Sequence, residues 1–581
     1  MTAIRRGHQQ NLIGRRQFLR GGLAGLGTMA LAVPSWAADK PSLMASPNNP
    51  IVPAAKLNQI GFAPQGRKRF SLSETTGRPV TRFAIETTDG WTLYRDRLEP
   101  RLYNLSETAG EHVRCGDFTP LTRPGTYRVV ADGHRSDPFT ITATPYGDVL
   151  HDAARAFYLI RANAPLNDPL TGIRHRASHQ IDHTLRVGGM RRDLSGGWYN
   201  AGDYGKWTNM AAISASHMMW LYELRPDTVT ALDLDLPNPY PGVPDMLAEA
   251  RWGLEWLHKM QNPDGSVLHK VDTEPDFAWG WMPENDPYYR HASGIGSLNA
   301  GVFVGVMAQA ARVFAPFDAD FAERCGHAAQ ISWRWLGEYP NLPTSDPYYS
   351  DRDAWQEKLW ALCEIARLTE DKDRLHRATA ELEHRGVTAV SWTAPHILGA
   401  LTLSQMRGTR GADVARASIF AAAGVIGGRV SADAYGFSSV RSDYDWGSAE
   451  NALNDANACL LAAELTGVPE CRDTGVRLMD YVLGNNSLGL CMLTGHGTHN
   501  ISRPYHWTYR TAGIVMPGWA SGGPNAVLSG GDLLLEAVIN RGVPPAKCLV
   551  DACDDDGSWA SNEGETSENA ALVMALGLYD L

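Results

Sequence analysis

Residues 244–261 read PDMLAEARWGLEWLHKMQ, and this stretch indicates the fold class of most of the chain. Its apolar positions recur at intervals of three and four residues; they are Leu247, Ala250, Leu254 and Leu257. That spacing places them on one face of an α-helix. The Pro-Asp pair at the front of the stretch is typical of a helix start. We therefore predict an amphipathic helix that packs one face into a core.

The same periodicity continues through most of the chain from about residue 146 onward. Residues 448–465 repeat it, and Gly467 lies just beyond them as a helix stop. Comparable helices are predicted at residues 149–160, 298–314, 319–336, 354–369 and 470–484. The sequence thus predicts a mainly α-helical domain over residues 146–581.

Residues 54–142 have a different period. Phe83 and Ile85 alternate with polar or small residues and lead into Asp89-Gly90, a strong hairpin-turn signal. Further turn signals and alternating segments follow at a spacing typical of short strands. This segment predicts a small β-sandwich in front of the helical domain.

The start of the chain is typical of an export signal. Arg15 and Arg16 precede a short apolar run, which ends near the small-residue cleavage pattern Ser35-Trp36-Ala37. The run is too short and too rich in glycine for a permanent membrane anchor. We predict a twin-arginine signal at residues 1–38, a linker at 39–53, and a periplasmic or secreted protein.

Composition excludes several partner classes. The net charge of -11 disfavours nucleic acids and anionic membranes, which reward clustered Lys and Arg. The 18 Trp and 20 Tyr suggest sugar binding, because flat rings stack on sugars, although most of these rings are expected to fill the core. The eight Cys fit neither a disulfide scaffold nor a paired zinc motif. Cys548 and Cys553 are near enough to bridge, but folding before export argues against it.

Four long loops interrupt the helical pattern, at residues 196–207, 272–290, 494–525 and 554–569. Loops of this length in a compact domain usually carry function. The first reads GGWYNAGDYGKW and holds Asp203 among glycines and aromatic residues. Asp203 fits either a catalytic carboxylate in a sugar cleft or a cap of the following helix. Local reasoning leaves both readings open.

The last loop carries a second candidate carboxylate. Glu563 follows Trp559 and precedes an apolar helical run, so its carboxyl group can be desolvated enough to keep a proton. Glu565 and Glu568 compete for the same role. All three also fit the negative charge that stabilises a helix start.

The two loops resemble inverting glycoside hydrolases of family nine, many of which are cellulases. The family's loop G-G-W-x-D-A-G-D-Y is similar to residues 196–204, and its Asn-Glu pair with a spaced Asn-Ala is similar to residues 562–570. The resemblance covers nearly all of the mature chain. It implies an (α/α)6 barrel preceded by an immunoglobulin-like β-sandwich, with Asp203 as general base and Glu563 as general acid.

Departures from the family pattern affect the catalytic support. The other Asp of the loop, which helps hold the water in the family, is Asn200 here. The family's His-His-Arg segment is similar to Tyr505-His506-Trp507, so His506 keeps a hydroxyl-binding role while the cation is lost. The predicted substrate-binding residues are Tyr204, Trp446, Tyr505, Trp507 and Trp559. Further candidate sugar platforms are Trp198, Trp207, Trp279, Trp281, Tyr444 and Trp519.

The resemblance predicts no firm metal requirement. Where some relatives bind zinc, Ala162 and Ser178 replace the thiolates, so zinc is not expected. Where relatives bind calcium, Gln356 and Thr393 replace carboxylates, which leaves Asp351 and Glu357 as weak candidates.

The resemblance implies cleavage of β-1,4-glucosidic bonds in cellulose-type glucans or cello-oligosaccharides. An exo-β-glucosaminidase that acts on chitosan oligomers is an alternative, because the altered loop and the lost Arg could reflect an aminosugar. A weakly catalytic glucan-binding protein is a second alternative, on account of Asn200. A helical scaffold protein explains the periodicity but not the two motifs. The sequence leaves endo or exo action, chain-length preference and oligomeric state open.

Overall fold

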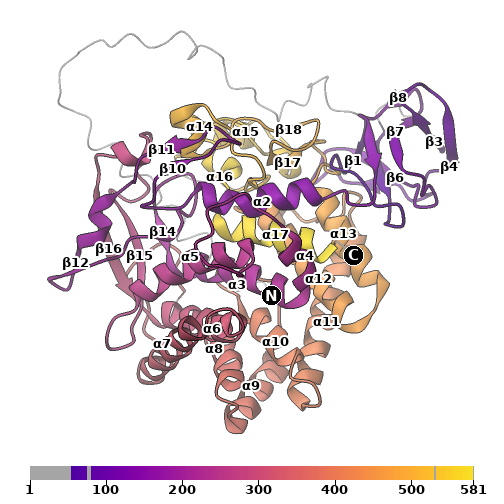
Figure 1. The fold of residues 1–581 in the computed structure, drawn as a ribbon. Helices are drawn as coiled ribbons and strands as arrows, with labels where there is room; N and C mark the ends of the chain where they lie inside the picture. The colour runs from indigo at the N-terminus through magenta and orange to yellow at the C-terminus, as the bar shows by residue number, and fades with distance from the viewer. Residues whose placement is uncertain (1–53, 75–79, 352, 529–530, 556, 580–581) are drawn as a thin grey trace, which may run out of the picture.

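The computed structural model describes residues 54–74, 80–351, 353–528, 531–555 and 557–579. A β-rich part lies at one side of a much larger helical part (Figure 1). The predicted export signal, residues 1–38, and the predicted linker, residues 39–53, lie outside the described residues.

The β-rich part is a sandwich of two antiparallel sheets, as predicted. The first sheet has the order β1-β2-β6-β5 and the second β4-β3-β7-β8, with β9 also paired to β7. The strands are β1 (Ala55–Leu57), β2 (Arg69–Ser73), β3 (Arg82–Thr87), β4 (Thr92–Arg97), β5 (Tyr103–Asn104), β6 (His112–Asp117), β7 (Gly125–Ala131), β8 (His134–Arg135) and β9 (Phe139–Ile141). Phe83 and Ile85 point into the core, which confirms the alternation read from the sequence.

The helical part is an (α/α)6 barrel, so the predicted fold class is confirmed. Its inner helices are α3 (Thr208–Leu224), α6 (Ser297–Phe314), α8 (Trp355–Leu368), α10 (His396–Ser404), α12 (Ser448–Thr466) and α17 (Thr566–Tyr579). Its outer helices are α2 (Gly147–Leu159), α5 (Asp245–Met260), α7 (Ala319–Glu338), α9 (Lys372–Arg385), α11 (Arg410–Ser431) and α13 (Pro469–Val482). Each outer helix packs against an inner neighbour.

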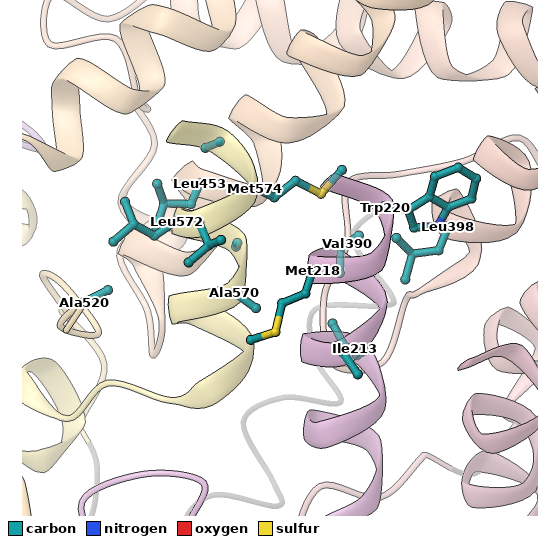
Figure 2. Close-up of a cluster of buried hydrophobic side chains, with 14 of the residues drawn as sticks. Ile213, Met218, Trp220, Val390, Leu398, Leu453, Ala520, Ala570, Leu572 and Met574 are labelled. Carbon is teal, nitrogen blue, oxygen red and sulfur yellow. The ribbon is translucent and has the colours of Figure 1, made fainter. Parts of the chain in front are cut away.

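The inner helices are buried on nearly every side. Helix α17 packs against both α3 and α12, and α3 continues the ring through α6, α8 and α10. Figure 2 shows Met218 and Met574 in the space between α3 and α17, with Leu453 and Leu572 on the other side of α17. A helix enclosed in this way must be apolar around its whole circumference, which is why Ala570–Leu578 shows little amphipathic pattern.

Short elements connect the helices of the barrel. The strands are β10 (Leu166–Asn167), β11 (Arg174–His175), β12 (Leu185–Val187), β13 (Met190–Arg192), β14 (Lys206–Trp207), β15 (Leu268–Glu274), β16 (Tyr289–Ile295), β17 (Cys491–Thr494) and β18 (Asn500–Ile501). The short helices are α4 (Pro226–Ala231), α14 (Trp507–Ala512), α15 (Leu533–Asn540) and α16 (Trp559–Asn562).

All four predicted loops contain short regular elements, and the loop at residues 272–290 is partly wrong because both of its ends are strands. Residues 272–274 belong to β15, which pairs with β14 on one side and with β16 on the other. Within the pair β15–β16, Asp272 lies opposite His291 and Thr273 opposite Arg290. These residues are polar although the strand is buried, so an apolar alternation could not indicate it.

The sandwich is fixed to the barrel by buried polar contacts. The Lys56 Nζ donates to the Tyr435 hydroxyl at 2.9 Å and to the Ser487 carbonyl at 3.0 Å. The Asn58 amide donates to Asp480 Oδ1 at 2.7 Å. Burial lowers the pKa of Lys56 to about 8, although the neighbouring carboxylate Glu111 acts against this. The sandwich and the barrel are therefore joined through a buried polar interface.

All eight cysteines of the sequence lie in the described part, and all are free thiols. The bridge considered between Cys548 and Cys553 is not formed, because Cys548 Sγ donates to the Val543 carbonyl instead. Two helices, α6 and α11, are long and apolar enough to cross a membrane by length and composition alone. The α6 window is 94% buried inside the barrel, as in a core helix, whereas the α11 window is 33% buried.

Candidate active site

A buried group of charges holds the glycine-rich loop, residues 196–207. Asp182 accepts hydrogen bonds from Arg290 at 3.1 and 3.2 Å and lies 2.9 Å from Lys206 Nζ. Arg290 also donates to the Tyr204 carbonyl at 2.7 Å. The loop is therefore held on both sides of Gly205, at Tyr204 by Arg290 of β16 and at Lys206 by Asp182.

The charges in this group compensate each other. Burial alone raises the pKa of Asp182, but the cations Arg290 and Lys206 outweigh it and hold that pKa below its ordinary value. Burial lowers the pKa of Lys206 to about 8 against the attraction of Asp182. A carboxyl group with a depressed pKa in the folded state stabilises the protein above its unfolded-state pKa, and this stabilisation is lost as the pH falls.

An Asp182→Asn variant is expected to lose about 3 to 5 kcal/mol of unfolding free energy at pH 7, because two buried cations lose their counter-charge. The difference in unfolding free energy between the variant and the wild type should become smaller as the pH falls below about 4, because the Asp182 carboxyl group of the unfolded wild type is then protonated. Urea unfolding at pH 7 and at about pH 2.5 measures both effects. The control is Asp193→Asn, whose carboxylate is 48% exposed and pairs with Lys259, with an expected loss below about 1 kcal/mol. Equal losses in the two variants would contradict this account.

Asp203 lies in the middle of this loop and is buried, with 2% of its surface exposed. Its Oδ1 accepts a hydrogen bond from the Gly205 amide at 2.8 Å. The following helix, α3, begins at Thr208 with Trp207 as its N-cap residue and no side-chain cap. Asp203 therefore does not cap that helix, which removes the structural alternative left open by the sequence.

The loop with Asp203 contacts Glu563 directly. The Gly202 amide donates to Glu563 Oε1 at 3.1 Å, and the Gly202 carbonyl accepts from the Trp507 amide at 3.0 Å. A side chain at Gly202 would lie 2.4 Å from the Tyr505 carbonyl and 3.1 Å from Glu563 Oε1. Only glycine fits this approach. Three segments that are well separated in the sequence, around residues 202, 505–507 and 563, thus meet at one point.

Asp532 holds the turn that carries Glu563. Its Oδ1 accepts from the amides of Leu535 and Ser558 at 3.0 and 2.9 Å, and its Oδ2 accepts from the Ala560 amide at 2.9 Å. Glu563 itself is buried, with 3% exposed. Sequence reasoning missed Asp532, because its partners lie across a segment with no regular pattern.

Asn200 is tied to the segment that follows Glu563. Its Oδ1 accepts from the Thr566 hydroxyl at 2.7 Å, and its backbone carbonyl accepts from the Thr566 amide at 2.8 Å. The buried Nδ2 has no hydrogen-bond partner among the described residues. Asn200 therefore presents an amide N–H donor where an aspartate would present a carboxylate oxygen.

His506 is neutral and has one nitrogen engaged. Burial lowers the pKa of His506 to about 3. The Thr508 amide donates to Nδ1 at 3.2 Å, so the ring proton resides on Nε2. That buried Nε2 has no partner in the described part of the chain. An unpaired N–H donor is what the predicted hydroxyl-binding role requires.

Two of the predicted sugar-binding residues lie in an aromatic cluster under the loop. Tyr204 packs 5.1 Å from Tyr199 and 6.1 Å from Trp507 between ring centroids, and its hydroxyl donates to the Trp281 carbonyl. Trp507 also meets His175 edge to face. Tyr204 and Trp507 are as buried as the two carboxylates, so exposure alone does not test their predicted roles.

A second aromatic cluster lies beside the turn that carries Glu563. Tyr505 packs 4.2 Å from the half-buried Trp279 and 5.9 Å from Trp559. This places Trp279, a member of the wider candidate set, next to two of the predicted sugar-binding residues. Trp446 lies half-buried in the turn before α12. Sugar binding by these rings stays a prediction.

Glu565 and Glu568, the competitors for the acid role, belong to a different cluster. The Tyr349 hydroxyl donates to Glu565, and burial followed by the charges of Glu450 and Glu565 raises the pKa of Glu568 well above its ordinary value. Burial and the charge of Glu565 raise the pKa of Glu450 to about 8. Of the three candidate carboxyl groups, Glu563 accepts a hydrogen bond from the loop with Asp203.

The segment considered for zinc has other partners. His179 Nδ1 lies 2.5 Å from the Tyr199 hydroxyl, and Nε2 lies 2.8 Å from Asp286 Oδ2. The Tyr199 hydroxyl donates to Ser178 at 2.7 Å. Both ring nitrogens of His179 are therefore engaged, and this donor set does not fit a zinc ion.

The segment considered for calcium has few charged ligands. Glu357 is fully buried, and neither carboxylate oxygen has a partner among the described residues. Burial, then the charge of Asp351, raises the pKa of Glu357 well above its ordinary value, which favours a neutral side chain. The described residues contain no group of three His, Cys, Asp or Glu arranged to hold a metal. This donor set does not fit calcium, which takes about six to eight oxygens.

Asp272 is a further carboxyl group at the site that the sequence did not single out. It lies on β15 beside the loop with Asp203, is fully buried, and has an Oδ2 without a partner in the described segments. The motif His269-Lys270-Val271 immediately before it was the available signal. This motif leads to Asp272 only if β14 is known to pair with β15, and no local sequence pattern predicts that pairing.

Comparisons with known proteins are consistent with this geometry. The sequence profile described as Glycosyl hydrolase family 9 matches residues 146–576, and that of a cellulase N-terminal ig-like domain matches residues 52–136. Endoglucanase C of Cellulomonas fimi is 29% identical over 571 residues, covering 90% of this chain and 51% of the relative. The chain thus spans about half the length of that relative.

Two other proteins match over nearly their whole length. The cellodextrinase of Butyrivibrio fibrisolvens is 27% identical over 550 residues, covering 90% of this chain and 98% of the relative. A crystal structure of the family 9 endoglucanase J30 superposes with a TM-score of 0.83 at 30% identity, covering 90% of this chain and all of that one.

Proposed function

This chain belongs to glycosyl hydrolase family 9, and from this membership we propose that it cleaves β-1,4-glucosidic bonds by inversion, with Asp203 as general base and Glu563 as general acid. It is a glycoside hydrolase of the cellulase type, and its relatives support a β-1,4-glucan substrate. The observation that carries the assignment is the hydrogen bond from Gly202 to Glu563, because it joins the two loops that bear the carboxyl groups.

In the proposed reaction, the Asp203 carboxylate removes a proton from a water molecule as the water oxygen attacks the anomeric carbon. The bond from that carbon to the leaving oxygen breaks, and Glu563 donates its proton to this oxygen. Attack from the face opposite the leaving group inverts the configuration. The proton taken up by Asp203 returns to Glu563 through solvent before the next turnover.

Neighbouring donors are suited to orient the reactants. Asn200 presents an N–H group from the same loop as Asp203, which supports a role in holding the water oxygen. His506 presents its Nε2–H from the segment that contacts Gly202, which supports a hydrogen bond to a sugar hydroxyl. Tyr204, Trp446, Tyr505, Trp507 and Trp559 are the proposed substrate-binding aromatic residues.

A substrate panel tests this function. Reducing-end release from carboxymethylcellulose and cello-oligosaccharides should be readily measured, while chitosan oligomers should release little glucosamine. Matched Asp203→Ala and Glu563→Gln proteins serve as controls. Equal rates in the wild type and both variants would remove the assignment, and a preference for chitosan oligomers would establish the aminoglucan alternative instead.

We also propose that the protein is exported by the twin-arginine route to the periplasm or beyond. The support is the sequence of residues 1–38, with Arg15 and Arg16 ahead of an apolar run. Replacing both arginines by lysine should retain the charge but leave the activity in the cytoplasm, since the export pathway reads the arginine pair. Cell fractionation measures this, and unchanged export of the double variant would contradict the proposal.

A further inference from the structure

Asp272 and Asp203 lie on either side of one small space beside the loop. Strand β14 pairs with β15 so that Lys206 lies opposite Val271, and the same register places Gly205 opposite Asp272. A methyl group built on Gly205 would lie 2.8 Å from the Trp207 indole nitrogen, 3.1 Å from Asp203 Oδ1 and 3.3 Å from Asp272 Oδ1. Both carboxyl oxygens therefore approach the same point, which the glycine leaves open.

The lysine on the same strand forms an ion pair with Asp272 but lies closer to two other carboxyl groups. Lys270 Nζ lies 2.8 Å from Asp276 and 2.9 Å from Asp346, but 4.0 Å from Asp272 Oδ2. Asp272 Oδ1 accepts from the Thr273 amide at 2.7 Å. The Oδ2 atom has no partner among the described residues, and the side chain is fully buried.

The other titratable groups around Asp272 are committed elsewhere. Arg290 is bound to Asp182, and His291, opposite Asp272 in the sheet, lies 3.5 Å from Asp276 Oδ1. Burial, and then the negative charge of Asp203, raises the pKa of Asp272 well above its ordinary value. Two buried carboxyl groups this close cannot both ionise readily, so one keeps a proton.

We infer that Asp272 is the proton-sharing partner of Asp203, and that it takes over the part of the second acidic group that the glycine-rich loop lacks at Asn200. The inference rests on the proposed role of Asp203. In the resting enzyme Asp272 is protonated and Asp203 ionised, and the Asp272 O–H stabilises the Asp203 carboxylate directly or through one water. The Asp272 proton is not consumed, because the proton removed from the attacking water goes to Asp203.

The inference predicts a specific change in pH dependence. A hydrogen-bond donor stabilises the ionised form of a carboxylate, so removing the donor should make the ionised base harder to form. In Asp272→Ala and Asp272→Val, the acidic limb of the kcat/KM profile on cellopentaose should move to higher pH by at least about 0.5 unit. The value of kcat should fall by about tenfold or more, with KM nearly unchanged.

Controls separate this role from a structural one. Asp272→Asn keeps a donor of the same shape and should recover most of the lost kcat. Asp276→Asn, which alters another partner of Lys270, should leave the acidic limb in place. Thermal unfolding identifies any variant that does not fold, and the valine variant fills the buried space with a residue suited to a strand.

The outcomes distinguish this inference from the assigned reaction. Two results would overturn the role of Asp272 while leaving the assignment as a hydrolase intact. One is an acidic limb that does not move, and the other is a shift to lower pH, which is expected if the substitution only removes a negative charge. A wild-type protein without hydrolysis of cello-oligosaccharides would instead overturn the proposed function. Loss of kcat in the asparagine variant equal to that in the alanine variant would also contradict the role of Asp272 as a hydrogen-bond donor to Asp203.

Discussion

A Glu563→Gln variant is expected to lose about 10²- to 10⁴-fold in kcat on cellopentaose, because the glutamine amide cannot protonate the leaving oxygen. The buried turn should keep its geometry, since the amide carbonyl can still accept from the Gly202 amide at the position of Glu563 Oε1. KM should change little, as the loss lies in the chemical step. Steady-state kinetics with product analysis measures the effect.

The leaving group gives a sharper test of the acid role. A dinitrophenyl β-cellobioside releases a stable phenolate that needs no proton, so Glu563→Gln should cleave it within about tenfold of the wild-type rate. Glu565→Gln, which alters the neighbouring acidic cluster, should not show this dependence on the leaving group. If Glu563→Gln lost both substrates equally, the acid would have to be another residue.

An Asp203→Ala variant is expected to lose about 10²- to 10⁴-fold in kcat on both kinds of substrate, because every substrate needs an activated water. Azide is a nucleophile that needs no base and can enter the space left by the carboxylate. It should restore turnover and give an α-glycosyl azide, with Glu563 still protonating the leaving oxygen. NMR of the azide product measures rate and configuration together.

The two variants control each other. Azide should not rescue Glu563→Gln on cellopentaose, and a good leaving group should not rescue Asp203→Ala. Formation of a β-glycosyl azide by Asp203→Ala would show a double displacement and contradict an inverting base at this position.

The sequence predicted the strongly periodic elements to within a few residues. Helix α5, read as residues 244–261, spans Asp245–Met260, and α12, read as 448–465, spans Ser448–Thr466. In both cases apolar spacing and stop signals agree with the buried face. Helices α9 and α11 were not predicted from the sequence, because α9 is highly charged with few apolar residues and α11 contains several glycines.

The site was predictable only where its chemistry follows from local sequence. Asp203 and Glu563 stand out because glycines and aromatic residues surround them within a few positions. Their positioning groups do not: Asp182 reaches Arg290 across 108 residues, and Asp272 meets the loop through a short sheet. Such contacts depend on strand pairing over long sequence distances, which a local pattern does not carry.

The most direct test of the assigned reaction is anomer-resolved NMR of cellopentaose hydrolysis by the wild-type protein. In the proposed mechanism, a water molecule activated by Asp203 attacks from the face opposite the leaving oxygen, which Glu563 protonates. The new reducing end should therefore appear first as the α-anomer and then equilibrate. First appearance of the β-anomer would show retention of configuration and would contradict the roles given to both carboxyl groups.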